Sequence, residues 1–249
     1  MNAEKRGGRY ERQTVIPAIG EAGQERLLSS SVLIAGLGGL GSPVALYLAA
    51  AGIGRLGLVD PDTVSESNLQ RQVIHGLSTM GRKKVESAAA RLRDLNPDVR
   101  VTEYPGQLTP VNAASLVREY DVVVACLDNM ESRYLLNDAC VGAGKPLVEG
   151  GVMRFSGMIT TIVPGKGPCY RCIFPETPGA NPMDPARAGI LGPVPGVIGS
   201  MQAMEVLKLV LGIGEPLVGR LLLVDMLACS FKEVVVPRNP SCPSCGGLR

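Results

Sequence analysis

Short apolar runs recur along the first 150 residues, and each is followed by a segment with apolar positions at helical spacing. Val32–Ala35, Leu56–Val59 and Val122–Cys126 are continuous and aliphatic, as strands buried on both faces are. The other expected strands are Val99–Tyr104 and Pro146–Glu149, and the expected helices are 3–28, Pro43–Ala51, Gly81–Leu95, Val111–Arg118 and Ser132–Ala143. This alternation predicts an α/β fold with a doubly wound, mainly parallel sheet.

The pattern changes after Gly151. Phe155–Val163 and Leu221–Val236 have the pattern of antiparallel hairpin strands, and Val197–Leu211 that of a helix. Between them, residues 175–195 form a loop rich in proline and glycine. A loop of about 20 residues is long for a compact domain, so we expect it to be mobile and functional.

Composition narrows the class of protein. The 25 basic and 23 acidic residues give a net charge of +2, too small to indicate a nucleic-acid or membrane surface. The N-terminus is charged and lacks a signal-peptide core, and no run reaches the roughly 18 apolar residues that span a bilayer. We therefore expect a soluble, cytoplasmic protein that binds neither nucleic acid nor membrane. With one histidine, His75, chemistry that depends on several histidines is excluded.

A glycine motif follows the first expected strand. Gly36-x-Gly38-x-x-Gly41 precedes a helix, and the next strand ends at Asp60, 19 residues after Gly41. This is the order of the Rossmann nucleotide-binding unit, in which the glycines let the backbone approach a phosphate and the acid meets a ribose hydroxyl. Alone it suggests NAD. The polar and cationic cluster at 68–72 is unlike a dehydrogenase.

The seven cysteines fall into two groups. Cys169-x-x-Cys172 and Cys242-x-x-Cys245 are two CxxC pairs in turn-rich segments, which predicts a closed, structural Cys₄ zinc site. The alternative is a pair of redox-active dithiols, which would favour a thioredoxin-like context that is missing here. The other cysteines have apolar surroundings and are expected to be small buried hydrophobes: Cys126, Cys140 and Cys229.

Six motifs in order resemble those of one known family. They are GLGGLGSP (36–43), the run from Gly52-Ile53-Gly54 to Asp60-x-Asp62, SNLQRQ (67–72), GRKKVESA (81–88), LDN (127–129) and the paired CxxC. The chain resembles the MoeB/ThiF adenylyltransferases, relatives of the ubiquitin-activating enzymes, from Arg9 to the last CxxC. Members of that family use ATP to activate the C-terminal glycine of a ubiquitin-like sulfur-carrier protein.

The resemblance implies a set of site residues. Gly36–Gly41 and the following helix would hold phosphate, Asp60 the ribose, and Asp128 a Mg²⁺ ion. Arg71 and Lys84 would neutralise the phosphates. The full set implied for nucleotide binding is Gly36, Gly38, Gly39, Gly41, Asp60, Asp62, Asn68, Arg71, Gln72, Lys84, Asp128 and Asn129. The competing interpretations are solvated surface charges for Arg71 and Lys84 and a helix cap for Asp128.

The resemblance also implies a homodimer and a division of the chain. Arg12 would reach the triphosphate of the other subunit, unless it is an ordinary exposed helix residue. We expect a single adenylating domain, with a helical arm at 1–30, a Rossmann-like nucleotide-binding part at 31–150, and a part at 151–249 that binds the carrier, which ends in Gly-Gly, and zinc. Arg133 matches the family's arginine after the Asp-Asn pair.

The chain departs from the family pattern in one place. Some relatives carry a cysteine in the loop, which forms a thioester or disulfide with the carrier, but residues 181–193 read NPMDPARAGILGP, with Asp184 and Pro185 at that place. We therefore expect an enzyme that makes the acyl-adenylate without covalent transfer. The alternative function is an NAD-binding redox protein that uses CxxC dithiols; Arg71 and Lys84 favour the ATP-dependent enzyme, since hydride transfer needs no such cations.

Overall fold

An eight-stranded sheet forms the centre of the molecule. The computed structural model describes residues 3–176 and 189–248. Its strands are β1 (Ser31–Ala35), β2 (Arg55–Val59), β3 (Arg100–Tyr104), β4 (Val122–Ala125), β5 (Leu147–Met153), β6 (Ser156–Ile162), β7 (Arg220–Asp225) and β8 (Ser230–Val235). Their order across the sheet is β3-β2-β1-β4-β5-β6-β7-β8.

The first five strands are parallel and the last three are antiparallel. β1 pairs in parallel with β2 and β4, β2 with β3, and β4 with β5, whereas β6, β7 and β8 each pair antiparallel with the strand before. This confirms the predicted fold class. The strand order reverses between β1 and β4, and in open α/β sheets ligands bind outside the carboxyl ends of the strands at such a switch point.

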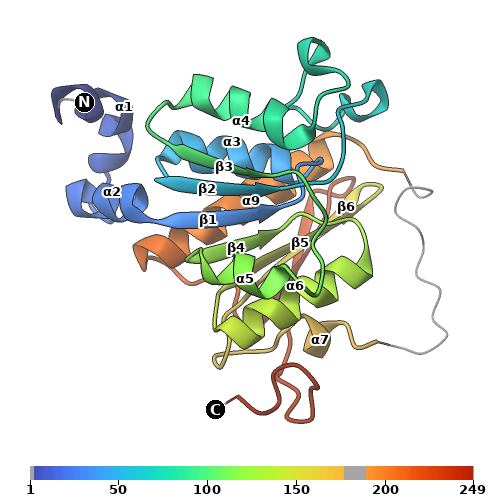
Figure 1. The fold of residues 1–249 in the computed structure, drawn as a ribbon. Helices are drawn as coiled ribbons and strands as arrows, with labels where there is room; N and C mark the ends of the chain where they lie inside the picture. The colour runs from blue at the N-terminus through green and yellow to red at the C-terminus, as the bar shows by residue number, and fades with distance from the viewer. Residues whose placement is uncertain (1–2, 177–188, 249) are drawn as a thin grey trace.

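Helices cover both faces of the sheet (Figure 1). Val32 and Ile34 of β1 lie in one core with α3, α4 and α9, while Leu33 and Ala35 lie in a second core with α5 and α6, because successive strand residues point to opposite faces. The helices are α1 (Ala3–Thr14), α2 (Gly20–Ser29), α3 (Gly41–Ala51), α4 (Lys84–Leu95), α5 (Ala113–Arg118), α6 (Met130–Ala143), α7 (Tyr170–Ile173) and α9 (Pro193–Leu211).

Several elements differ from the sequence-based expectation. Residues 3–28, expected to be helical, form two helices, α1 and α2, because residues 15–19 around Pro17 are turns. The helix expected from Gly81 begins at Lys84, because Lys83 is extended and forms a bridge with Thr63. The strand expected to end at Glu149 continues to Met153, since β5 pairs with β6 along its whole length. The last helix begins at Pro193 rather than Val197, a position where proline's missing N–H costs nothing.

Helix α9 is long and apolar enough, by length and composition, to cross a membrane, although Gln202, Glu205 and Lys208 interrupt its run of apolar residues. Half of its most apolar 18-residue window is buried in the protein. The helix packs against α3, β5 and β6. These contacts are those of a core helix, which is apolar for the same physical reason as a membrane span.

The two edges of the parallel part of the sheet carry different features. Tyr10 of α1 lies against Gly52 and accepts a hydrogen bond from Asn96 (2.8 Å), so α1 covers the edge where β1 and β2 begin. At the opposite edge, the carboxyl ends of β1, β2 and β4 lead directly into the glycine motif, Asp60 and the 126–129 segment. Figure 1 shows α1 and α2 on the left and the carboxyl ends on the right.

Candidate functional site

The glycine loop between β1 and α3 is closed so tightly that two of its positions exclude a side chain. Gly36 has a φ of 96°, and a Cβ on it would lie 2.4 Å from the Cys126 carbonyl oxygen. A Cβ on Gly41 would lie 2.0 Å from the Gly36 carbonyl oxygen. Glycine is therefore required at both positions.

The loop leaves backbone donors available. Within residues 3–176 and 189–248, no protein acceptor contacts the backbone N–H of Gly38 or Gly39. Both precede the first turn of α3, where N–H groups and the helix dipole favour an anion. Position 39 is also crowded, since a Cβ there would lie 3.0 Å from Pro195 and 3.5 Å from Cγ of Arg71.

The buried side chain of Asp60 accepts a hydrogen bond from the glycine loop. Its side chain is 4% exposed; Oδ2 accepts from the Leu37 N–H at 2.7 Å and Oδ1 from the Asp62 N–H at 2.9 Å. Charge-assisted bonds of this kind are stronger than neutral ones. The acid at the end of β2 thus orders both the glycine loop and the segment that follows it.

Lys84 is the first residue of α4 and is brought to the same edge. It is 4% exposed, and Nζ lies 2.8 Å from Oδ2 of Asp62. The Asp62 carboxylate is 63% exposed, so it pairs with the buried ammonium from the solvent side. The interpretation of Lys84 as a solvated surface charge is wrong.

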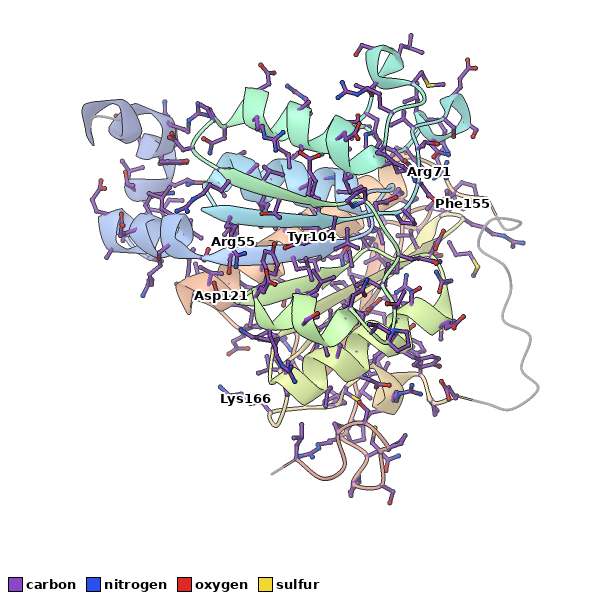
Figure 2. The ribbon with its side chains drawn as sticks, in the orientation of Figure 1. Arg55, Arg71, Tyr104, Asp121, Phe155 and Lys166 are labelled. Atoms are coloured by element: carbon purple, nitrogen blue, oxygen red, sulfur yellow. The ribbon has the colours of Figure 1, made fainter. Side chains whose placement is uncertain are left out.

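The SNLQRQ segment crosses over the loop in a series of turns. The Asn68 carbonyl accepts from the backbone N–H of Arg71 and of Gln72, and Arg71 Nη1 donates to Ser67 O at 3.2 Å. Gln72 is buried, and its amide lies 3.6 Å from the place of a Cβ on Gly38. Its Oε1 has no partner among the described residues. A buried acceptor beside the loop fits a hydroxyl donor such as a ribose. Figure 2 shows Arg71 on the side of the molecule where β1 and β2 end.

Asp128 lies exposed after β4, and it is not a helix cap. The cap of α6 is Asn129, whose Oδ1 accepts from the Ser132 N–H at 2.8 Å. The cap interpretation of Asp128 is therefore wrong, and among the described residues its carboxylate accepts from the Asn129 amide at 3.2 Å. A single exposed acid at a strand end fits Mg²⁺, which binds one or two carboxylates together with phosphates.

Arg133 and Glu149 form a buried ion pair behind Asp128. The Arg133 side chain is 8% exposed and that of Glu149 fully buried. The guanidinium also donates to the carbonyls of Leu127 and Gly150, so it fixes the residue that precedes Asp128. Burial raises the pKa of Glu149 to about 7 against the opposing charge of Arg133. Sequence reasoning missed Glu149, because only the pairing of β4 with β5 brings it beside α6.

His75 is a second residue whose site contacts the sequence does not reveal. Its ring bonds to the Leu37 carbonyl and to Ser87, and it is buried, as are Asp60 and Lys84. The signal that could have found it is its place three residues after Gln72, in the segment that crosses the loop.

Arg12 is not part of this cluster in its own chain. It is exposed in the last turn of α1, at the edge where β1 and β2 begin. A role at the carboxyl edge would therefore require a second subunit. The loop positions Asp184 and Pro185 lie outside the described residues.

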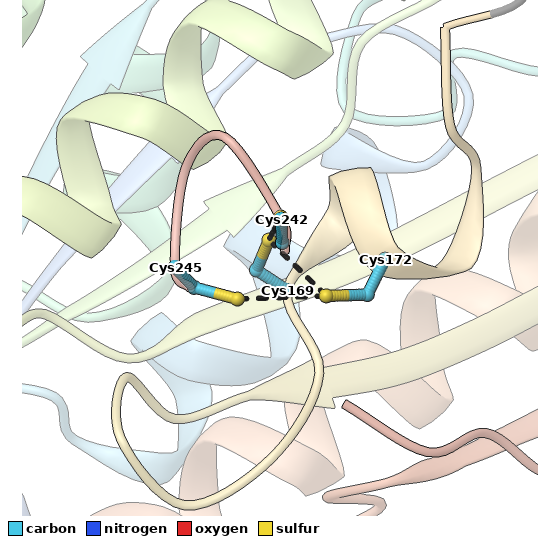
Figure 3. Close-up of side chains that lie close together, drawn as sticks. All are labelled: Cys169, Cys172, Cys242 and Cys245. Atoms are coloured by element: carbon cyan, nitrogen blue, oxygen red, sulfur yellow. Dashed lines mark hydrogen bonds between the residues drawn. The ribbon is translucent and has the colours of Figure 1, made fainter. Parts of the chain in front are cut away.

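The four cysteines of the CxxC pairs converge (Figure 3). Their sulfurs lie within 4.8 Å of one another, with 3.5 Å between Cys169 and Cys242 and 3.4 Å between Cys172 and Cys245. Sulfurs bound tetrahedrally at about 2.3 Å from zinc are separated by about 3.8 Å. Four sulfur donors at this spacing fit Zn²⁺ without an open position.

The surroundings connect the cysteine cluster to α6. Asn137 accepts from the Tyr170 N–H at 2.9 Å and donates to Ser244 at 3.2 Å. One side chain of α6 therefore holds both CxxC segments. Such outer contacts orient metal ligands.

The three remaining cysteines do not share one environment. Cys126 and Cys140 are buried, as expected, and burial raises the pKa of both thiols strongly. Cys229 is exposed in the turn between β7 and β8, with a φ of 49°. The expectation that it is a buried hydrophobe is wrong, because its apolar neighbours belong to a hairpin turn rather than to a core.

Known proteins match nearly the whole chain. The ThiF family pattern matches residues 10–244. "Adenylyltransferase and sulfurtransferase MOCS3" of Sus scrofa is 54% identical over 96% of this chain and 53% of its own length. The chain thus spans about half the length of that relative. "Sulfur carrier protein adenylyltransferase" of Thermus thermophilus is 50% identical over 96% of this chain and 90% of its own.

Two further relatives extend this comparison. "SAMP-activating enzyme E1" of Haloferax volcanii is 50% identical over 96% of this chain and 88% of its own. Among solved structures, E. coli MccB with ATP has a TM-score of 0.80 and 27% identity over 90% of this chain and 68% of that chain.

Proposed function

Because this chain belongs to the ThiF family of MoeB/ThiF adenylyltransferases, we propose that it adenylylates the C-terminal glycine carboxylate of a ubiquitin-like sulfur-carrier protein. The observation that carries this proposal is the meeting of the glycine loop, Lys84 and Asp128 at the carboxyl edge of one sheet. The name of the Thermus relative, which matches over 90% of its length, supports the carrier as substrate. The longer pig relative carries a second activity in its name; we assign this chain the adenylylating one.

The proposed reaction is a displacement at the α-phosphate of ATP. A carboxylate oxygen of the carrier forms a bond to the α-phosphorus, the bond from that phosphorus to the oxygen bridging to the β-phosphate breaks, and pyrophosphate leaves. Nucleophile and electrophile are both anionic. Catalysis therefore requires positive charge and fixed positions more than proton transfer.

Each cluster at the edge has a place in this scheme. The free N–H groups of Gly38 and Gly39 bind phosphate oxygens, and Lys84 and Arg71 neutralise their charge. Asp60 and Gln72 Oε1, which has no partner among the described residues, bind the ribose hydroxyls. Asp128 holds Mg²⁺, which when bound neutralises phosphate charge. Arg12 adds a further cation from the second subunit of a homodimer.

We further propose that the zinc is structural. The Cys₄ set leaves no position for substrate, and it joins the C-terminal segment to α7 and α6, away from the glycine loop. The chain then divides into the arm at 1–30, the nucleotide-binding part at 31–150 and the carrier-binding and zinc part at 151–249. With Asp184 and Pro185 in the 175–195 loop, the product is the acyl-adenylate, without a loop thioester.

Pyrophosphate exchange tests the proposal. Purified protein, ATP and Mg²⁺ are incubated with labelled pyrophosphate and a small carrier that ends in Gly-Gly. We expect label in ATP only when the carrier has a free C-terminal carboxylate, and none with the same carrier amidated at that terminus. Exchange that is indifferent to the carrier terminus would overturn the proposal.

A further inference from the structure

We propose that His75 is a positioning residue of the nucleotide site: it fixes the peptide group between Leu37 and Gly38 so that the Gly38 N–H faces the phosphate. This inference rests on the proposed function, since it assigns His75 to the loop that would bind ATP. His75 itself lies under the loop and contacts the nucleotide only through Leu37.

Leu37 is held at both ends. Its N–H donates to Asp60 Oδ2 at 2.7 Å, and its carbonyl lies 3.1 Å from Nε2 of His75. Both partners are buried, His75 at 9% and Asp60 at 4% exposure. The two contacts fix the backbone orientation of Leu37, which lies between Gly36 and Gly38.

The planarity of the peptide group extends this control to Gly38. In a trans peptide, the C=O of one residue and the N–H of the next point in opposite directions. With the Leu37 C=O turned inward to His75, the Gly38 N–H must point outward, where no acceptor among the described residues meets it. Glycines at 36, 38 and 39 make this segment intrinsically free to rotate. A fixed donor therefore needs a partner outside the loop.

The state of the imidazole suits this role. Because a carbonyl only accepts, Nε2 carries the proton, and Nδ1 then accepts from Ser87 Oγ at 2.8 Å. Burial lowers the pKa of His75, with Lys84 acting in the same direction and Asp60 opposing. The ring is therefore neutral and in one tautomer near pH 7.

Ser87 connects the ring to the helix that carries Lys84. It lies one turn after Lys84 in α4 and contacts Thr79 Oγ1 at 2.9 Å. His75 thus bridges the glycine loop and α4, the two elements that supply the free N–H groups and the buried cation. Loss of the Leu37 contact is expected to affect the phosphates and to leave the adenosine part of the site in place.

Two uncharged substitutions separate positioning from packing. His75→Gln keeps an N–H near the place of Nε2, whereas His75→Asn keeps a polar group near Nδ1 and leaves the Leu37 carbonyl without a donor. Thr161→Val is the matched control, because it removes one buried hydrogen bond, to Glu205 at 2.5 Å, far from the loop. Kd is measured for ATP and for adenosine by calorimetric titration, without carrier.

We expect His75→Asn to weaken ATP binding about ten-fold or more, the scale of one hydrogen bond to a charged group. The Kd for adenosine is expected to stay unchanged. His75→Gln and Thr161→Val are expected to stay within about three-fold of the parent chain. If His75→Asn does not fold, Ser87→Ala replaces it, with a loss of ATP affinity of about three-fold and again no change for adenosine.

The proposal is overturned if His75→Gln and His75→Asn weaken ATP binding equally, or if adenosine binding weakens in parallel with ATP binding. It is also overturned if folded His75→Asn binds ATP with the affinity of the parent chain. These readouts do not depend on exchange activity. Failure of the proposed function would instead appear as a parent chain that binds ATP and supports no carrier-dependent exchange.

Discussion

The buried pair of Arg133 and Glu149 gives the sharpest stability prediction. In Glu149→Gln, the guanidinium of Arg133, whose side chain is 8% exposed, loses its only carboxylate partner among the described residues while it stays buried. Removing one partner of a buried pair costs about 3–5 kcal/mol. For a chain of this size, about 2–4 °C of melting temperature corresponds to 1 kcal/mol, so we expect a decrease of about 6–20 °C.

The assay is thermal unfolding followed by circular dichroism at about pH 8, above the raised pKa of Glu149, so that the carboxylate of the parent chain is charged. The double variant Arg133→Met, Glu149→Met is the control, because apolar side chains of similar volume often restore the stability of a buried pair. We expect it to recover most of the melting temperature. It will not recover exchange activity, since the bond from Arg133 to the carbonyl preceding Asp128 is gone.

A decrease of less than about 2 °C in Glu149→Gln would refute this reasoning. It would mean that the guanidinium reaches solvent or another acceptor when the carboxylate is removed. A double variant as unstable as the single one would place the cost in packing rather than in the unpaired charge.

Three further predictions concern separate parts of the molecule. Lys84→Ala is expected to lower pyrophosphate exchange about 10²-fold. Mixed Lys84→Ala and Arg12→Ala subunits should regain about a quarter of full activity, because about half of the random dimers are heterodimers and each of these has one intact site of two. No recovery on mixing would show that Arg12 does not act in the partner's site. Cys242→Ser should lose zinc, measured by atomic absorption, together with thermal stability, whereas Cys229→Ser should change neither. The folded-state pKa of His75 is lowered, so its neutral form stabilises the protein above about pH 6.5, and this contribution is lost as pH falls through the folded-state pKa. His75→Gln should therefore flatten this part of the curve of melting temperature against pH. An unchanged curve would contradict a buried neutral ring.

The strands and the metal cluster follow from local sequence. Continuous aliphatic runs such as Val122–Ala125 are fully buried in the parallel sheet, and the CxxC spacing suffices to predict a four-sulfur cluster. Both signals are local, since a strand or a CxxC turn needs only a few neighbouring residues to define it.

Contacts between distant segments could not be predicted in this way. Glu149 reaches Arg133 only through the β4–β5 pairing, and His75 reaches Leu37 across 38 residues of sequence. The capping side chain is Asn129 rather than its neighbour Asp128, which depends on where α6 begins. For Cys229 the local pattern gave a wrong prediction of burial. Apolar neighbours in sequence do not ensure burial when the residue lies in a hairpin turn.

The most direct test of the central claim follows the α-phosphate of ATP. The protein is incubated with Mg²⁺, a carrier ending in Gly-Gly and ATP that is labelled in either the α- or the γ-phosphate, and the products are separated rapidly at low pH. We predict that the α-label appears on the carrier as an acyl-adenylate, sensitive to hydroxylamine, and that the γ-label appears in pyrophosphate. Release of the γ-label as inorganic phosphate, with no α-label on the carrier, would contradict adenylylation.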